Sequence, residues 1–310
     1  MTPLVDYVLP KIENGNVPYW RLALRGCSQL CFQTNELTGL FFLAAVLVAS
    51  PIAAAYMFVA AFLAPGVRML LGHRHTIPTG APGLNPCLIA ISLPAFFATG
   101  WTSYSMWAVL LASIVIAAIL VRILVVIIPL PITALPFILV FWGLYALEPH
   151  VGFLQPAIAH TGAATPLPAS FHPVISVVHG LGEAVFSPTI ASGILFFLGV
   201  LVSNWRHAIV ALLGAFIGTY VAYFYSHADP SSVNLGLYGF NGVLGAVSTY
   251  VICGAKLRLA ILGALIATIG ISFFAYLGIP ALSAPFVFTL WIMIWLGWVE
   301  TSWHKDADPG

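Results

Sequence analysis

Long apolar stretches follow one another along most of this chain, and short polar connections separate them. Several stretches are shorter than the ~20 residues that a helix needs to cross a bilayer. The pattern still predicts membrane-embedded helices, five in each half of the sequence. They lie at 39–50, 52–67, 86–98, 104–128 and 135–147 in the first half, and at 190–203, 208–224, 240–253, 259–277 and 285–299 in the second.

Prolines stand at the edges of the short stretches in both halves, as Pro51, Pro86, Pro136 and Pro285 show. Short, proline-interrupted segments at matching places of two halves are typical of broken or half-spanning helices beside a solute site.

The halves share an unusual set of residues, at an offset near 150. This repeat predicts two domains, 1–150 and 151–310, with a transport path between them. The matching segments are Gln29-Leu-Cys-Phe32 with Glu183-Ala-Val-Phe186, Gly83-Leu-Asn85 with Gly239-Phe-Asn241, Pro131 and Pro136-Phe137 with Pro280 and Pro285-Phe286, and Trp142 with Trp291.

Composition supports a membrane protein, because hydrophobic residues make up 61% of the chain and charged residues 6%. A soluble domain carries about 25% charged residues. The net charge of +1 provides no basic field for nucleic acid. Residues 1–20 contain Asp6, Lys11 and Glu13 and lack a continuous apolar core, so we expect no signal peptide and insertion into a cytoplasmic-type membrane.

The basic residues indicate an orientation. With a cytoplasmic N-terminus and the spans above, all ten fall on the cytoplasmic face, as the positive-inside bias requires. An odd number of spans per half makes the two copies point in opposite directions, and both termini are then cytoplasmic. The ten are Lys11, Arg21, Arg25, Arg68, Arg74, Arg122, Arg206, Lys256, Arg258 and Lys305.

No catalytic or metal-binding motif is found, so we expect neither an enzyme nor a cofactor. The cysteines lie in apolar stretches without a CxxC pair and are interpreted as buried free thiols. They are Cys27, Cys31, Cys87 and Cys253.

Glu183 is the charge that most needs a reason, because it stands in an apolar run and a buried charge is expensive in a membrane. Its repeat partner is Gln29, and both side chains offer an oxygen acceptor. Phe186 and Phe32 follow three residues later and share the same face if these segments are helical. The structural alternative is that Glu183 pairs locally, for example with His179.

Two further features have both a structural and a functional interpretation. Leu84 with Leu88, and Phe240 with Leu244, are spaced i,i+4 and either pack in the core or line a pore. The repeated prolines either only kink their helices or free backbone carbonyls that face a wet cavity and accept from a solute. These prolines are Pro131, Pro136, Pro280 and Pro285.

The chain resembles the urea transporters, the family of bacterial and animal urea channels, and we assign it to the bacterial type. The family signature Leu-x-x-Pro-x-x-Thr-x-Pro-Phe is matched by Leu277-x-x-Pro280-x-x-Ser283-x-Pro285-Phe286, with serine for threonine. The first copy reads Ile128-x-x-Pro131-x-x-Ala134-x-Pro136-Phe137. Gln29-x-x-Phe32, Glu183-x-x-Phe186 and Gly236-Leu-Tyr-Gly-Phe240-Asn-Gly are similar to the family's paired pore motifs.

The resemblance implies an all-α membrane protein of two inverted repeats, each with five spanning helices and a tilted half-helix. It also implies a homotrimer, surrounded by membrane lipid, with one pore per protomer. Aromatic slots would hold the flat faces of urea, and a ladder of oxygens would accept from its N–H groups. The residues implied are Gln29, Leu30, Phe32, Leu84, Leu88 and Ala134 in the first half, and Glu183, Ala184, Phe186, Phe240, Leu244 and Ser283 in the second.

Two positions depart from the family pattern. Leu84 stands where the family commonly has phenylalanine, and Ala134 lacks a hydroxyl, although Thr133 is adjacent. The sequence thus favours a passive urea channel in the cell membrane. It leaves open a channel for ammonia or short amides and, with less support, an ion-coupled transporter or a membrane-embedded enzyme.

Overall fold

The computed structural model describes residues 17–72, 76–157 and 170–307. These residues form helices joined by turns, with an isolated bridge between Phe97 and Pro156. Lys11 and Arg74, on which the orientation argument partly rests, lie outside the described residues.

Within the described residues, four helices are long and apolar enough to cross a membrane. They are α4 (Pro51–Leu70), α6 (Tyr104–Ile127), α10 (Trp205–Tyr220) continued by the π-helix η5 (Val221–Tyr225), and α13 (Leu257–Tyr276). A fifth candidate is a broken span, in which α2 (Tyr19–Ser28) and η1 (Gln29–Cys31) meet α3 (Glu36–Ala49) at a bend of 70°.

The remaining helices are mostly shorter and apolar. In the first half they are η2 (Ile77–Thr79), η3 (Ala81–Gly83), α5 (Leu84–Phe96), α7 (Leu135–Leu147) and η4 (Glu148–His150). In the second half they are α8 (Pro173–Glu183), α9 (Ile190–Ser203), α11 (Pro230–Asn234), α12 (Gly239–Ile252) and α14 (Ala284–Ala307). Nine of the ten predicted stretches coincide with a helix to within a few residues, the tenth (285–299) is extended by α14 to Ala307, and α2 and α8 precede the first predicted stretch of each half.

Matching breaks precede α3 and α9. Phe32 ends η1 with φ of 58°, and Phe186 follows α8 with φ of 53°, a left-handed backbone that stops a helix. The next helices then start on Asn35 and Thr189, whose side-chain oxygens accept from the backbone N–H three residues on.

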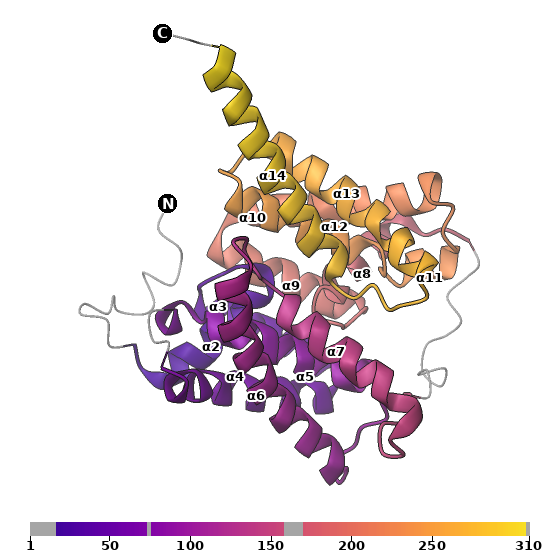
Figure 1. Ribbon diagram of the computed structural model, residues 1–310. Helices are drawn as coiled ribbons and strands as arrows, with labels where there is room; N and C mark the ends of the chain where they lie inside the picture. The colour runs from indigo at the N-terminus through magenta and orange to yellow at the C-terminus, as the bar shows by residue number, and fades with distance from the viewer. Residues whose placement is uncertain (1–16, 73–75, 158–169, 308–310) are drawn as a thin grey trace.

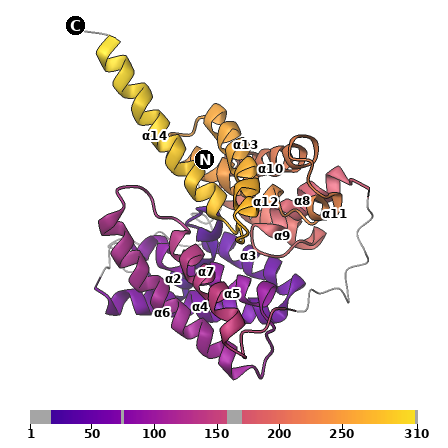
Figure 2. The same ribbon diagram turned by 45° about the vertical axis from the view of Figure 1, so that its right-hand side comes forward.

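The two halves of the chain form two lobes, indigo to magenta and salmon to yellow in Figure 1, which meet along α3 and α9. The view of Figure 2 shows the same division. Two hydrogen bonds of 2.7 Å cross this contact: the Thr38 hydroxyl donates to the carbonyl of Gly199, and the Ser192 hydroxyl donates to that of Ala45. The rings of Phe42 and Phe196 stack beside them, with centroids 4.7 Å apart.

A second reciprocal pair of bonds joins the lobes near the prolines. Trp142 Nε1 on α7 donates to the Pro280 carbonyl, and Trp291 Nε1 on α14 donates to the Pro131 carbonyl, both at 2.9 Å. Tryptophans of the opposite lobe thus use one acceptor position of each of these two carbonyls, and whether freed carbonyls also bind a solute stays a prediction.

The tryptophan pair makes a test of stability. Replacing Trp142 or Trp291 by phenylalanine leaves a carbonyl without its donor, so each change should destabilise the protein by about 1–3 kcal/mol. We expect similar drops in the unfolding temperature, measured by fluorescence in detergent, with Trp101→Phe as a surface control. A large effect for one variant alone would mean that the two bonds are not equivalent.

Candidate functional site

The ends of α2 and α8 lie where the lobes meet, and each is crossed by a short helix of its own half. Gly26 on α2 faces Gly83 before α5, and Gly180 on α8 faces Gly239 at the start of α12. A Cβ on Gly26 would lie 3.2 Å from the Gly83 Cα, and one on Gly180 would lie 3.0 Å from the Gly239 Cα. Both distances are tighter than most Cβ contacts in proteins, so glycine favours this close approach, which brings Leu84 and Phe240 beside the helix ends.

Phenylalanines from opposite lobes then meet in pairs. Phe32 approaches Phe286 edge to face with ring centroids 6.0 Å apart, and Phe186 approaches Phe137 in the same way at 6.2 Å. Both contacts have the geometry that aromatic quadrupoles favour. The structure thus brings Phe32 and Phe186 to the junction of the lobes.

Glu183 ends α8 with 8% of its surface exposed, and no described residue forms a hydrogen bond or ion pair with its carboxylate. His179 instead bonds the Asn234 carbonyl through Nδ1 at 2.8 Å. The interpretation of Glu183 as a local partner of His179 is therefore wrong for the described residues. An unpaired acid at this depth leaves its oxygens available to a polar solute or to water.

The expectation that the phenylalanines share a helix face with Gln29 and Glu183 is also wrong. Gln29 lies in the 3₁₀ helix η1, and Glu183 is the last residue of α8. Three residues after each of them, at Phe32 and Phe186, the backbone is left-handed, so neither segment continues as one helix. The change of direction aims Phe32 and Phe186 toward the opposite lobe.

Gln29 is held by its nitrogen. Its Nε2 donates to the Thr79 carbonyl at 2.7 Å and to the Thr34 hydroxyl at 3.1 Å. Because the amide nitrogen is bound twice, the oxygen Oε1 is the group left to face a solute. Gln29 thus offers an acceptor, as Glu183 does.

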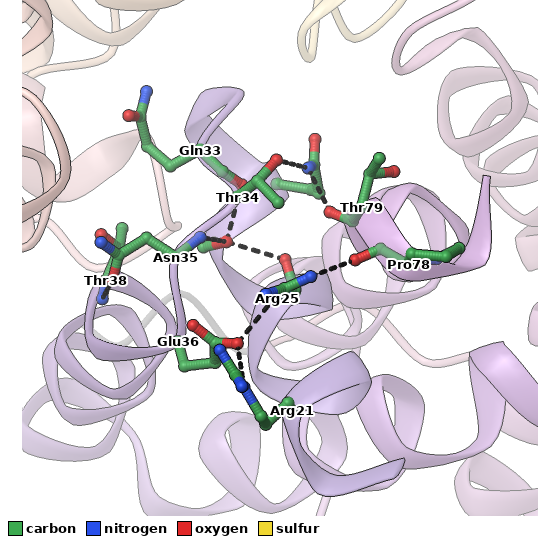
Figure 3. A network of polar contacts seen from close by, with 11 residues as sticks. Arg21, Arg25, Gln33, Thr34, Asn35, Glu36, Thr38, Pro78 and Thr79 are labelled. Atoms are coloured by element: carbon green, nitrogen blue, oxygen red, sulfur yellow. Dashed lines mark hydrogen bonds and ion pairs between the residues drawn. The ribbon is translucent and has the colours of Figure 1, made fainter. Parts of the chain in front are cut away.

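Arg21, Arg25 and Glu36 form an ion cluster next to the segment that binds Gln29. Glu36 Oε1 accepts from Arg21 Nε at 2.5 Å and from Arg25 Nε at 2.8 Å, and Arg25 also donates to the Pro78 carbonyl at 2.6 Å (Figure 3). Glu36 is only 1% exposed. The cluster fixes the end of α2 to the segment whose Thr79 binds Gln29.

The sequence analysis did not predict this cluster, because it assigned no partner to Glu36. Two arginines four residues apart on one short helix of an apolar chain were the available signal, since such charges need a carboxylate nearby.

The Thr34 bond can be tested by itself. Thr34→Val removes one of two acceptors of the Gln29 amide, so we expect solute flux to fall roughly twofold to fivefold with little loss of stability. Flux into proteoliposomes measures this, with Thr76→Val as control because its side chain forms no described bond to Gln29. Unchanged flux would show that Thr79 alone positions Gln29.

Two asparagines anchor the proline loops on the short helices. Asn85 donates to the Thr133 carbonyl at 3.0 Å and accepts from the Phe137 N–H at 2.9 Å. Asn241 donates to the Leu282 carbonyl at 3.0 Å. These bonds hold Ala134 and Ser283, the positions of the repeated signature, at the N-termini of α7 and α14.

Of the other expected site residues, Leu84 lies on the first turn of α5 and Phe240 on that of α12. Ser283 is buried and its hydroxyl has no hydrogen-bond partner, and the Thr133 hydroxyl is likewise unpartnered among the described residues. The buried ones are Leu30, Leu88, Ala134, Ala184, Phe240, Leu244 and Ser283, whereas Leu84 is half-buried.

The residues that the structure describes contain no cluster of three or more His, Cys, Asp or Glu side chains able to hold a metal ion. Cys27, Cys31 and Cys87 are buried free thiols, and Cys253 is a half-buried one.

The helices are apolar and expose aliphatic faces, and broken helices with unpaired acceptors meet at the junction of the two lobes. These features are typical of a multi-pass membrane transport protein. A model of the urea transporter family matches residues 20–297, so the chain belongs to this family. Family membership implies transport of urea across a membrane. No curated protein matches the chain.

Proposed function

We propose that the protein is a passive channel, which lets urea move down its gradient between the two lobes. Urea is flat and neutral, with N–H groups that need acceptors along its edge. The carboxylate of Glu183 is the observation that carries this proposal, because a buried acid that has no partner among the described residues is suited to accept from these N–H groups.

The rest of the proposed pore supports the same chemistry. Gln29 and Ser283 would add acceptors, and the ring faces of Phe32, Phe186 and Phe240 would supply flat apolar walls. Such walls cannot replace the hydration shell of an ion, whereas weak sites in series let a neutral solute enter and leave. The aliphatic positions Leu30, Leu84, Leu88, Ala134, Ala184 and Leu244 complete the proposed lining.

The proposed architecture is an inverted repeat of residues 1–150 and 151–310, with five spans and a half-helix in each. Reciprocal bonds of Thr38 with Gly199 and of Ser192 with Ala45, and those of the two tryptophans, support this symmetry. We also propose a homotrimer in the cell membrane with both termini cytoplasmic, on the family resemblance and the bias of basic residues.

Flux measurements test the channel. In proteoliposomes, urea equilibration followed by stopped-flow light scattering should saturate weakly and stay unchanged by pH and sodium gradients. Concentrative uptake driven by either gradient would contradict the proposal, and it would favour an ion-coupled transporter instead.

A channel for other small neutral solutes is the second candidate, because Leu84 and Ala134 depart from the family pattern. Comparing urea, formamide and ammonia on one preparation separates the two. If the aliphatic wall loosens selection, Leu84→Phe should raise the preference for urea over formamide about threefold, as expected for one improved aromatic contact. Faster ammonia than urea flux in the native protein would favour the second candidate.

A further inference from the structure

A cavity of about 260 Å³ is lined by residues of the first lobe. Its described lining comes from α4, α6, the first turn of α5 and the segments 76–82 and 132–133. Most of the wall is aliphatic, with Ile114, Val121 and Val125 of α6 along one side.

Two guanidinium groups stand on this wall. Arg68 is only 6% exposed, and its Nη1 has no hydrogen-bond partner among the described residues. Arg122 donates from Nη1 to the Leu71 carbonyl at 3.3 Å and thereby keeps the ends of α6 and α4 together. The described lining contains no aspartate or glutamate. Arg68 is a buried cation without a counter-charge in the described lining, and the exposed Arg122 stands on the same wall, so the pair favours an anionic ligand.

The location of the cavity narrows the choice of ligand. Both α4 and α6 are long enough to span a membrane, and Arg68 and Arg122 lie near their C-terminal ends. The guanidinium groups are therefore near the depth of lipid headgroups, and the part of the aliphatic wall from Ile114 to Val121 lies toward the middle of the span. Basic pockets between spanning helices at this depth bind anionic headgroups.

We propose that this cavity binds an anionic phospholipid, with its phosphate held by Arg68 and Arg122 and the start of an acyl chain along α6. A free anion would leave the aliphatic wall without a partner, whereas a lipid uses both parts. Leu84 and Thr133 also line the cavity, so the bound lipid contacts the back of the wall proposed for the pore.

Native mass spectrometry of the purified protein tests the site without reference to solute flux. We expect phosphatidylglycerol to bind at least tenfold more tightly than phosphatidylcholine with the same chains. Arg68→Gln and Arg122→Gln should each weaken phosphatidylglycerol binding about tenfold, as loss of one charge-assisted bond requires. Arg206→Gln is the matched control, because Arg206 stacks on Trp205 at 5.5 Å outside the cavity.

Ala118→Phe fills the aliphatic part of the cavity and leaves both charges in place, so it should also weaken lipid binding. This variant and Arg122→Gln carry the test if Arg68→Gln fails to fold. Equal binding of phosphatidylglycerol by the native protein and these variants would overturn the proposal. Equally tight binding of glycerol 3-phosphate would also overturn it, because it would indicate a site for a free anion. If Ala118→Phe loses the oligomer mass but still binds lipid, the proposal is overturned too, because the cavity is then a contact between copies.

Discussion

Glu183→Ala should lower urea flux by about tenfold to a hundredfold, because a hydrogen bond to a charged acceptor contributes about 1.5–3 kcal/mol. No described residue relies on the Glu183 carboxylate for a hydrogen bond, so folding and assembly should be preserved. Glu183→Gln keeps an oxygen acceptor and should retain more flux than the alanine variant. Stopped-flow light scattering of proteoliposomes measures both.

The matched control is Glu148→Ala, which removes an acid at the end of α7, away from the junction. It should leave flux unchanged. Normal conduction by Glu183→Ala would show that the carboxylate is not part of the urea path.

Glu36→Gln should destabilise the protein by about 3–5 kcal/mol, the cost of breaking a buried ion pair by removing one partner. The change takes away the carboxylate that both Arg21 and Arg25 bind. The end of α2 would then be less firmly attached to the Pro78–Thr79 segment, so the orientation of Gln29 should suffer as well. Thermal unfolding in detergent and urea flux of the surviving protein measure the two effects.

Glu36→Asp separates charge from reach, since it keeps a carboxylate on a shorter side chain. We expect an intermediate loss of stability. If the Glu36→Gln variant has the same unfolding temperature as the native protein, the cluster contributes nothing to stability. Gln29 would then be held in place by Thr34 and Thr79 alone.

Much of the helical framework was predictable, because hydrophobicity decides which segments enter a membrane. The predicted stretches at 104–128 and 135–147 match α6 and α7 closely, since proline and polar loops mark their ends. The repeated residues, including Asn85 and Trp142, were visible by their offset, although the offset does not say what they bind.

Other features depend on contacts that sequence spacing does not contain. The left-handed turns at Phe32 and Phe186 are set by packing between lobes, because local preference would continue the helix. The Pro131 and Pro280 carbonyls meet tryptophans about 140 to 160 residues away in the chain. The Glu36 cluster needs the segment after α4 to fold back on α2, which no local pattern predicts.

Four hydrogen bonds between the lobes restrict how the lobes can move against each other. Their donors are Thr38, Ser192, Trp142 and Trp291. Alternating access rocks one repeat against the other. Such rocking here would separate all four bonds together, at a cost of about 1–3 kcal/mol for each polar group left unmet. With the lobes joined in this way, urea flux should rise with temperature only as steeply as diffusion in water does.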